Sequence, residues 1–407
     1  MKKKKIFISM HYMELGGAEI SLIGLLQALD YSKYDVDLFI HSHQGELMQF
    51  IPKEVNILPE NREYALVEKP MVEVLKASCL RLLWARLKAK YQFKKYMKKT
   101  GVKQSAAIYQ YIGDAVTPIL PSLHFLGEYD LAISFLNPHN IVRDKVKAKK
   151  KACWIHTDYS RIDIDIEREL PVWASYDYVI SISPEVGKSF TKVFPSLSNQ
   201  IVEIENILSP VFVRKRAKEF DVYKEMPKEP GIINILSVGR FSDAKNYDNV
   251  PEICKKINVN LNADGVSKLN VRWYLIGYGG DEDLIRNKIS EAGMENYVII
   301  LGKRSNPYPY IEACDIYAQP SRYEGKSVTV REAQMLCKPV VVTNYPTAKS
   351  QIKNGVDGVI VPLNNEDCAQ GMADFIRNKK LQDDIIEYLQ THDFGNLSEA
   401  QKIDSLV

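Results

Sequence analysis

The sequence predicts an α/β protein of two domains, each built on a parallel β-sheet that helices cover on both faces. Its 407 residues exceed the size at which a single hydrophobic core usually stops growing. The apolar fraction of 45% is sufficient to fill two cores. Short apolar runs also alternate with longer amphipathic stretches, a pattern typical of βαβ units. These observations together favour two separate sheets.

The expected strands fall into two series. The first series comprises residues 6–10, 36–40, 131–135, 152–155 and 178–181. The second comprises 232–238, 271–276, 297–301, 316–319, 340–343 and 358–361. Helical patterns follow at 366–378 and 381–389.

Between the two series lies a segment without apolar periodicity. Residues 211–231 are rich in Lys, Glu and Pro, which predicts a solvated connector. We therefore expect an N-terminal domain at 1–209 and a C-terminal domain at 210–392. The tail at 393–407 is expected to pack back on the first domain through a last helix from Leu397.

Composition excludes several classes of protein. A net charge of +3 is too small for a chain-wide nucleic-acid surface. The apolar run at 6–10 is too short for a signal-peptide core, and no run approaches the ~18–20 apolar residues of a spanning helix. The six cysteines form no Cys-x-x-Cys pair, which indicates reduced thiols rather than a disulfide framework. A cytoplasmic protein, soluble or peripheral on the inner membrane face, is expected.

One insert, residues 72–103, is helical by pattern and strongly basic. Aromatic and aliphatic residues, among them Trp84 and Tyr91, alternate with its lysines and arginines. Such an amphipathic helix can lie on an anionic membrane surface. An ordinary solvated surface helix is the competing interpretation.

The start of the C-terminal domain carries the first candidate site residues. A predicted strand ends just before Gly239, and Arg240 and Lys245 follow it. Ligands of open α/β sheets bind at the carboxyl ends of the strands. An arginine fork and a mobile lysine suit a diphosphate there, although the two could also be ordinary exposed loop charges.

A second constellation follows the predicted strand at 316–319. Glu324, Gly325 and Lys326 form a turn, and a helix is expected to begin near Ser327. Its first amides and its dipole would attract a phosphate oxygen, and Gly325 would allow close approach of a ligand. Glu332, in the first turns of that helix, could accept both hydroxyls of a ribose, or could be an ordinary helix acid.

The N-terminal domain offers weaker signals. Gly16 and Gly17 stand between the first strand and a helix, where they permit tight backbone passage under a phosphate or acceptor group, or merely form a turn. His156 follows the predicted strand at 152–155 and would face the ligand edge, with His11 as a competing histidine. Asn206 is expected to shape a turn and is left out of the catalytic set.

These motifs, taken together, resemble the family 4 retaining glycosyltransferases. The resemblance covers nearly the whole C-terminal half in the family's order and is weaker in the N-terminal half. It rests on the runs Gly16-Gly17-Ala18-Glu19, Val238-Gly239-Arg240 with Lys245, Ile276-Gly277-Tyr278-Gly279, Pro320 to Gly325, Glu332-Ala333 and Lys338-Pro339-Val340-Val341.

The resemblance implies the GT-B fold, two Rossmann-like domains with parallel sheets facing across a cleft. It implies a nucleotide-sugar donor, with UDP the commonest nucleotide, and a glycan or lipid-linked acceptor. A catalytic set and a donor-binding set follow from it. The first comprises Glu324, His156, Arg240 and Lys245, and the second Gly16, Gly17, Gly239, Arg240, Lys245, Gly325, Lys326, Ser327 and Glu332.

Within that family Arg240 and Lys245 would neutralise the diphosphate, Glu332 would hold the ribose and Glu324 would lie beside the donor sugar. Lys326 departs from the small or aliphatic residue that often follows Glu-Gly in the family, which leaves the donor sugar open. His156 would stand near the reacting bond. The family implies no metal and no dedicated protein base, because the leaving diphosphate oxygen is thought to help deprotonate the acceptor.

Electrostatic stabilisation of the leaving diphosphate is the largest help such a reaction can receive. A metal-dependent enzyme would instead use an Asp-x-Asp pair, of which the chain has two, at 163–165 and 281–283. Neither pair ends a predicted strand, so no metal is expected. A sugar-nucleotide epimerase, a phosphorylase and a silent scaffold of a polysaccharide assembly complex are the competing functions. The basic insert suggests a lipid-linked acceptor in capsule, O-antigen or teichoic-type synthesis.

Overall fold

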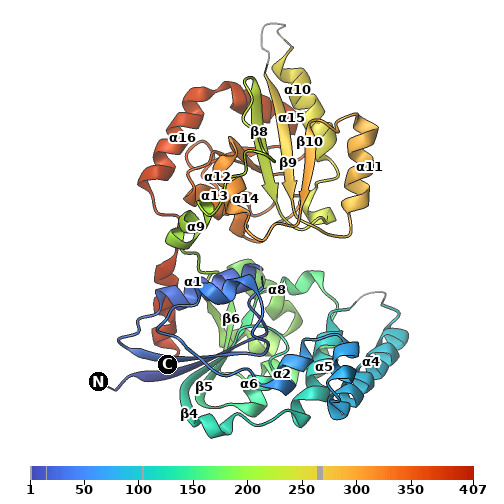
Figure 1. Ribbon diagram of the computed structural model, residues 1–407, viewed down its shortest axis with the longest axis vertical. Helices are drawn as coiled ribbons and strands as arrows, with labels where there is room; N and C mark the ends of the chain where they lie inside the picture. Colours follow the sequence, from blue (N-terminus) through green and yellow to red (C-terminus); the bar gives the residue numbers. More distant parts are fainter. Residues whose placement is uncertain (1, 15, 103–104, 264–268) are drawn as a thin grey trace. The chain divides into compact units, whose positions relative to one another are not determined.

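The computed structural model describes residues 2–14, 16–102, 105–263 and 269–407. It divides the chain into two compact units (Figure 1). The first unit is Met1–Leu208 together with Asn396–Val407, and the second is Ser209–Gly395. Each unit has its own buried apolar core against its own sheet.

The first unit contains a seven-stranded parallel sheet in the order β3-β2-β1-β4-β5-β6-β7. The order reverses between β1 and β4, so the loops after these two strands flank a crevice at the carboxyl edge. The strands are β1 (Lys4–Met10), β2 (Tyr34–Ile40), β3 (Asn56–Ile57), β4 (Glu128–Ser134), β5 (Lys147–Ile155), β6 (Tyr178–Ser181) and β7 (Ile201–Glu203). The helices are α1 (Gly17–Ala28), α2 (Arg62–Val67), α3 (Met71–Lys76), α4 (Leu80–Thr100), α5 (Ala107–Val116), α6 (Asn140–Lys145), α7 (Ile166–Trp173) and α8 (Pro184–Val193).

The second unit contains a six-stranded parallel sheet in the order β10-β9-β8-β11-β12-β13. Its order reverses between β8 and β11. The strands are β8 (Ile232–Val238), β9 (Asn270–Ile276), β10 (Val298–Gly302), β11 (Ile316–Gln319), β12 (Val340–Thr343) and β13 (Val359–Val361). The helices are α9 (Pro210–Ala217), α10 (Val250–Leu261), α11 (Glu282–Ala292), α12 (Tyr308–Ala313), α13 (Val328–Met335), α14 (Ala348–Gln351), α15 (Asn365–Arg377) and α16 (Lys379–Thr391).

The prediction of two helix-covered parallel sheets is confirmed. The predicted strands coincide with observed strands because each is an apolar run buried on both faces, as the fully buried ends of β1, β8 and β11 show. Two short strands, β3 and β7, are absent from the prediction. With two and three residues they carry no periodicity to detect.

The prediction of a solvated connector at 211–231 is wrong in its first part. Helix α9 begins at Pro210, and the side chain of Ser209 accepts a hydrogen bond from the Phe212 amide. Proline at the first helical position and serine at the cap are strong start signals. Phe212 and Val213 are buried within the second unit, which makes this helix part of its core.

The prediction of one helix at 72–103 is also wrong in detail. The segment forms α3 and α4, separated at Ser78, whose φ of 57° lies in the left-handed region. Helix α4 lies beside α5 (Figure 1), and Ala89 of α4 is buried in one cluster with Ala107 and Tyr111 of α5. Helix α4 ends at Gly101, which is in the left-handed conformation. Lys103 lies outside the described residues.

The tail of the chain belongs to the first unit. Residues Leu397–Ser405 form a 3₁₀ segment rather than the expected α-helix. Asp404 accepts hydrogen bonds from the ammonium group of Lys33 at 2.8 Å and from the hydroxyl of Tyr34 at 2.6 Å. Ile403 is fully buried, so the tail is anchored by both apolar and polar contacts.

The loops after β8 and β9 approach one another closely. The amide of Gly239 donates to the carbonyl of Ile276 at 2.9 Å, and the amide of Phe241 donates to the carbonyl of Tyr278 at 2.9 Å. A Cβ added at Gly277 would lie 1.9 Å from the carbonyl oxygen of Gly239. The glycine at 277 therefore allows the loop that bears Arg240 to pack on its neighbour.

Replacing Gly277 by alanine is expected to destabilise the second unit by about 1–3 kcal/mol, because the methyl group meets backbone rather than a flexible side chain. Differential scanning calorimetry measures the effect as a lowered Tm. The matched control is Gly280→Ala, since a Cβ at Gly280 meets nothing within 4 Å. Equal Tm values for the two variants would show that the close approach is not required.

Candidate donor-binding site

The reversal of strand order between β8 and β11 places two loops on either side of one crevice in the second unit. The loop after β8 carries Gly239, Arg240 and Lys245, and the loop after β11 carries Glu324. Both motifs predicted from the sequence therefore lie at the carboxyl edge of adjacent strands. This edge is where open α/β sheets bind their ligands.

The loop after β8 presents its two cations differently. Arg240 is exposed, and no ion pair is described for it in the chain that the structure covers. Lys245 is at the end of a short 3₁₀ turn, and Asn246 follows in the left-handed conformation with φ of 60°. A Cβ at Gly239 would lie 3.0 Å from Cε of Lys245, so the lysine stem passes directly over this glycine.

Lys245 and Glu324 form an ion pair. Nζ of Lys245 lies 2.5 Å from Oε1 of Glu324. The same oxygen accepts hydrogen bonds from the hydroxyl of Ser321 at 2.6 Å and from the amide group of Gln319 at 2.8 Å. The sequence placed Lys245 at a diphosphate and Glu324 at a sugar, and the structure brings the two side chains into direct contact.

Further bonds hold the two loops together. The guanidinium of Arg322 donates to both carboxylate oxygens of Asp248, at 2.9 and 2.7 Å. The side-chain amide of Asn246 donates to the carbonyl of Pro320 at 2.9 Å. The sequence alone gave Arg322 no function, and nothing local could have identified its partner, because Asp248 lies 74 residues away along the chain.

Helix α13 begins after Ser327, at the position expected from the sequence. The Ser327 amide is not available to a phosphate in this structure, because it donates to Oε1 of Gln351 at 3.0 Å. Gly325 has open space on its Cβ side, with nothing within 4 Å. Lys326 in the same turn is partly buried. The turn thus leaves room for a ligand beside Gly325.

Glu332 is buried, with 2% of its surface exposed. The hydroxyl of Tyr308 donates to its Oε1 at 2.7 Å. Burial raises the pKa of the Glu332 carboxyl to about 7, although the bond from Tyr308 acts in the opposite direction. A neutral or half-ionised carboxyl that is already hydrogen bonded is a finding that the sequence did not predict.

In the first unit, Gly16 and Gly17 differ in the space beside their Cα atoms. A Cβ at Gly16 would lie 2.2 Å from Oε2 of Glu19, whereas Gly17 has nothing within 4 Å. Glu19 is buried in the first turn of α1, and burial raises its pKa to about 7. Gly16 therefore makes room for a buried carboxyl at the start of the helix.

His156 directly follows β5, as expected from the sequence. Its ring is 4.9 Å from Phe135 and stacks on Trp154 at 6.0 Å between centroids. Neither ring nitrogen has a partner with hydrogen-bond geometry among the described residues, and the same holds for Oδ1 of Asn206. Burial lowers the pKa of His156 to about 4, an effect that the backbone of Phe135 and the side chain of Asn206 offset in part. The ring is neutral at neutral pH.

Three aspartates of the two Asp-x-Asp pairs lie at helix caps or accept hydrogen bonds within the protein. Asp165 caps α7 and accepts a hydrogen bond from the hydroxyl of Tyr111 at 2.8 Å. Asp163 accepts from the hydroxyl of Tyr96 at 3.2 Å. Asp281 is at the cap position of α11, where the helix dipole favours an acid.

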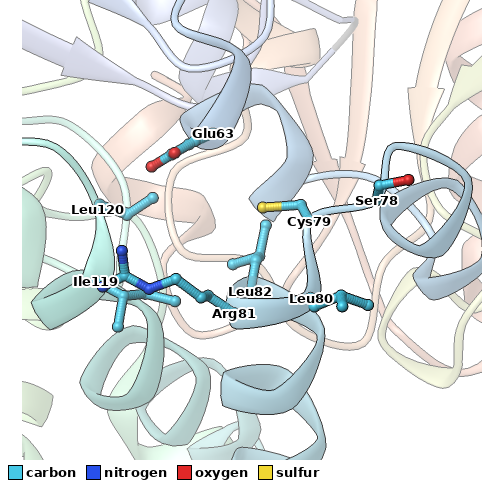
Figure 2. Close-up of a pocket in the computed structure, with 8 residues that line it drawn as sticks. All are labelled: Glu63, Ser78, Cys79, Leu80, Arg81, Leu82, Ile119 and Leu120. Carbon is cyan, nitrogen blue, oxygen red and sulfur yellow. The ribbon is translucent and has the colours of Figure 1, made fainter.

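A pocket of about 240 Å³ lies in the first unit at the break between α3 and α4 (Figure 2). Leu80, Leu82, Ile119 and Leu120 line it, with the charged ends of Glu63 and Arg81 also at the pocket. Ligand pockets for drug-sized molecules are typically ~300–1,000 Å³. The pocket is too small and too apolar to be the site of a nucleotide sugar.

Most of the second unit is similar in sequence to a known family. Residues 222–392 match the family described as Glycosyl transferases group 1. The match covers less than half of the chain and lies within the second unit. It runs from before β8 to beyond β13, so it includes every donor-site residue of the second unit.

Two curated relatives share part of this chain's sequence. An N-acetylgalactosamine-N,N'-diacetylbacillosaminyl-diphospho-undecaprenol 4-alpha-N-acetylgalactosaminyltransferase of Campylobacter jejuni is 27% identical over 36% of this chain and 38% of its own length. A UDP-Gal:alpha-D-GlcNAc-diphosphoundecaprenol alpha-1,3-galactosyltransferase of Escherichia coli is 30% identical over 32% of this chain and 33% of its own length. The chain therefore spans about a third of the length of each relative.

A solved structure extends the likeness to the whole chain. Anabaena Alr3699/HepE in complex with UDP and glucose superposes with a TM-score of 0.59 and 17% identity, covering 99% of this chain and 98% of that one. At this identity the match shows the fold, which is the GT-B fold of two α/β units expected from the sequence.

The buried Glu332 gives the second unit a pH-dependent stability. Because burial raises its pKa from the usual 4.5 to about 7, the folded state holds a proton that the unfolded state releases between these pH values. This carboxyl therefore stabilises the fold at low pH, and the contribution falls as the pH rises to about 7.

The variant Glu332→Gln is expected to remove this dependence. The Tm difference between wild type and variant should favour the wild type more at pH 5 than at pH 8, as measured by scanning calorimetry. Glu291→Gln, which changes an exposed glutamate of α11, is the control and should give a flat difference. A flat difference for Glu332→Gln as well would mean that this carboxyl is ionised throughout.

Proposed function

We propose that this protein is a retaining glycosyltransferase that moves a sugar from a nucleoside diphosphate, expected to be UDP, to a glycan or lipid-linked acceptor. The observation that carries the proposal is the arrangement of Arg240, Lys245 and Glu324 at the strand-order reversal of a group 1 glycosyl transferase domain. Both curated relatives named above are transferases that act on diphospho-undecaprenol-linked sugars by their names.

The diphosphate leaves with negative charge that the protein must stabilise. Arg240 is the cation with the most exposure and can grip two oxygens as a fork. The ammonium of Lys245 carries three donors, of which the pair with Glu324 uses one, so two remain for phosphate oxygens. The start of α13 adds its dipole. This set requires no metal at the diphosphate.

Glu324 would act on the donor sugar while it positions Lys245. Its Oε1 takes the bonds from Lys245, Ser321 and Gln319, and its Oε2 is the atom left for a sugar hydroxyl. Gly325 beside it provides open space. Glu332 would accept the ribose hydroxyls in its ionised form, and His156 would hydrogen-bond the reacting sugar through its ring.

Acceptor-dependent release of UDP from a UDP-sugar, followed with a coupled assay, tests the proposal. Release without acceptor, or binding without any release, would favour a scaffold. Arg240→Ala is expected to weaken UDP binding about 10–100-fold by isothermal titration calorimetry, the equivalent of one charge-assisted fork. The control is Arg286→Ala, since Arg286 pairs with Glu282 on the surface of α11. Equal affinities for the two variants would contradict the assignment.

The basic face of α4 supports a membrane-bound acceptor. Leu80, Trp84, Leu87 and Tyr91 are all exposed and recur at helical spacing along one stripe, opposite the buried Leu82 and Ala89. Lysines and arginines surround this stripe, and α4 contains no acidic residue. No helix in the described part of the chain has the length and apolarity to span a bilayer. The composition of α4 is that of a helix lying in an anionic interface.

Replacing Lys94, Lys95, Lys98 and Lys99 by glutamate is expected to reduce binding to vesicles of phosphatidylglycerol and phosphatidylcholine at least 100-fold, because each basic residue contributes roughly 1 kcal/mol near such a surface. Vesicle co-sedimentation measures the binding of each variant. The control reverses four exposed lysines of the same unit outside α4: Lys53, Lys147, Lys188 and Lys192. If both quadruple variants lose binding equally, net charge rather than α4 is responsible.

A further inference from the structure

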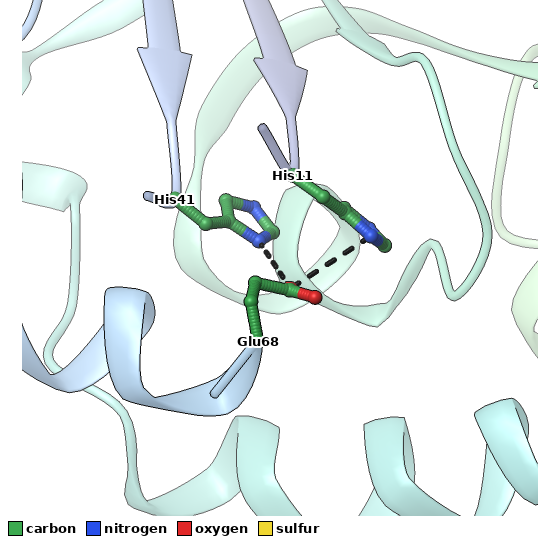
Figure 3. A group of neighbouring side chains, drawn as sticks. All are labelled: His11, His41 and Glu68. Atoms are coloured by element: carbon green, nitrogen blue, oxygen red, sulfur yellow. Dashed lines mark hydrogen bonds and ion pairs between the residues drawn. The ribbon is translucent and has the colours of Figure 1, made fainter. Parts of the chain in front are cut away.

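A group of metal-ligating side chains lies in the first unit, and none of its members belongs to the donor-site residues described above. His11 directly follows β1, and His41 directly follows β2. These strands are parallel neighbours, so the two histidines meet at the same edge of the sheet. Glu68 comes from the residue after α2 and points between them, as Figure 3 shows.

The backbone fixes the two histidines side by side. The amide of His41 donates to the carbonyl of Met10, and the amide of Ser42 donates to the carbonyl of His11, each at 2.9 Å. The strand pairing thus continues one step beyond β1 and β2. As a result the imidazole rings stack, with centroids 4.9 Å apart and planes 23° from parallel.

Glu68 lies in a segment that Arg86 holds in place. Nη1 of Arg86 donates to the carbonyls of Leu66 at 3.3 Å and Lys69 at 2.6 Å, on either side of Glu68. Oε1 of Glu68 then lies 3.2 Å from Nδ1 of His41 and 3.7 Å from Nδ1 of His11. The ligand atoms that the three side chains offer all lie within 4.8 Å of one another.

These separations match those around a tetrahedral metal ion. Zinc–nitrogen and zinc–oxygen bonds of about 2.0–2.2 Å place two ligand atoms about 3.3–3.5 Å apart in a tetrahedron. The separations of 3.2 and 3.7 Å bracket that value. Two histidines and one glutamate are also a known zinc ligand set that leaves a fourth position open.

The surroundings of His41 fit a ligand role. Its Nε2 is 3.0 Å from the hydroxyl of Ser9, which is buried. If Nε2 carries the proton, it donates that proton to the Ser9 hydroxyl, and the lone pair of Nδ1 is left for a metal. A metal-bound histidine usually makes such a hydrogen bond through its other ring nitrogen.

We propose that His11, His41 and Glu68 bind a divalent transition-metal cation, with Zn²⁺ the best match to the ligands. The side chain of His41 is 2% exposed, whereas those of His11 and Glu68 are 15% and 16% exposed. The ion therefore enters from the side of His11 and Glu68, and its fourth position, on that side, takes water or an anionic oxygen. The three ligands all belong to the first unit, whereas the residues proposed for the diphosphate belong to the second.

Titration of chelator-treated, full-length protein with Co²⁺ and then Zn²⁺ tests the proposal. One Co²⁺ per chain should bind with the ligand-field absorption of a four-coordinate site, and Zn²⁺ should displace it. His11→Gln and Glu68→Gln should each weaken binding at least 10-fold. His43→Gln, a change in an exposed histidine two residues from His41, should leave binding intact.

Circular dichroism and Tm values establish that the variants are folded, and His11→Gln is the safer variant because its side chain is partly exposed. Absence of Co²⁺ binding by the native protein at micromolar concentration would overturn the proposal. So would equal affinity in the native protein and in folded His11→Gln, or an equal loss in His43→Gln, which would indicate adventitious binding by surface histidines.

Discussion

The ion pair between Lys245 and Glu324 is the interaction on which the donor site depends. It joins the loop after β8 to the loop after β11, across the point where the strand order of the second unit's sheet reverses. The pair also determines the charge of the crevice, because Glu324 balances Lys245 and leaves Arg240 as the uncompensated cation among these three. The Arg322–Asp248 bonds and the closely packed Gly277 loop support the same geometry.

Much of the fold could be predicted because each strand of a buried parallel sheet is a short apolar run in the sequence. Strands such as β8, β11 and β12 are apolar runs, and their order of occurrence with helices implies two sheets. Helix α9 was not predicted, because its charged residues Arg214, Lys215 and Arg216 interrupt the pattern of its buried apolar residues. The break between α3 and α4 at Ser78 was not predicted, because no glycine or proline marks it in the sequence.

The candidate site, too, could be predicted only in part from the sequence. Positions at strand ends, such as Arg240 and His156, follow from the order of strand and loop alone. Contacts between distant segments do not, and the Lys245–Glu324 pair joins residues 79 apart. The cluster of His11, His41 and Glu68 was not predicted from the sequence for the same reason, because its three residues follow three different elements and have no characteristic spacing. The burial that shifts the pKa of Glu332 likewise arises only from packing. The catalytic roles themselves stay predictions.

The location of the donor diphosphate is the central claim, and a crystal structure with bound UDP tests it most directly. We expect both phosphates at the carboxyl ends of β8 and β11, with their oxygens within hydrogen-bond distance of the Arg240 guanidinium and the Lys245 ammonium. Phosphates bound away from these two side chains, whether elsewhere in the second unit or in the first, would contradict it.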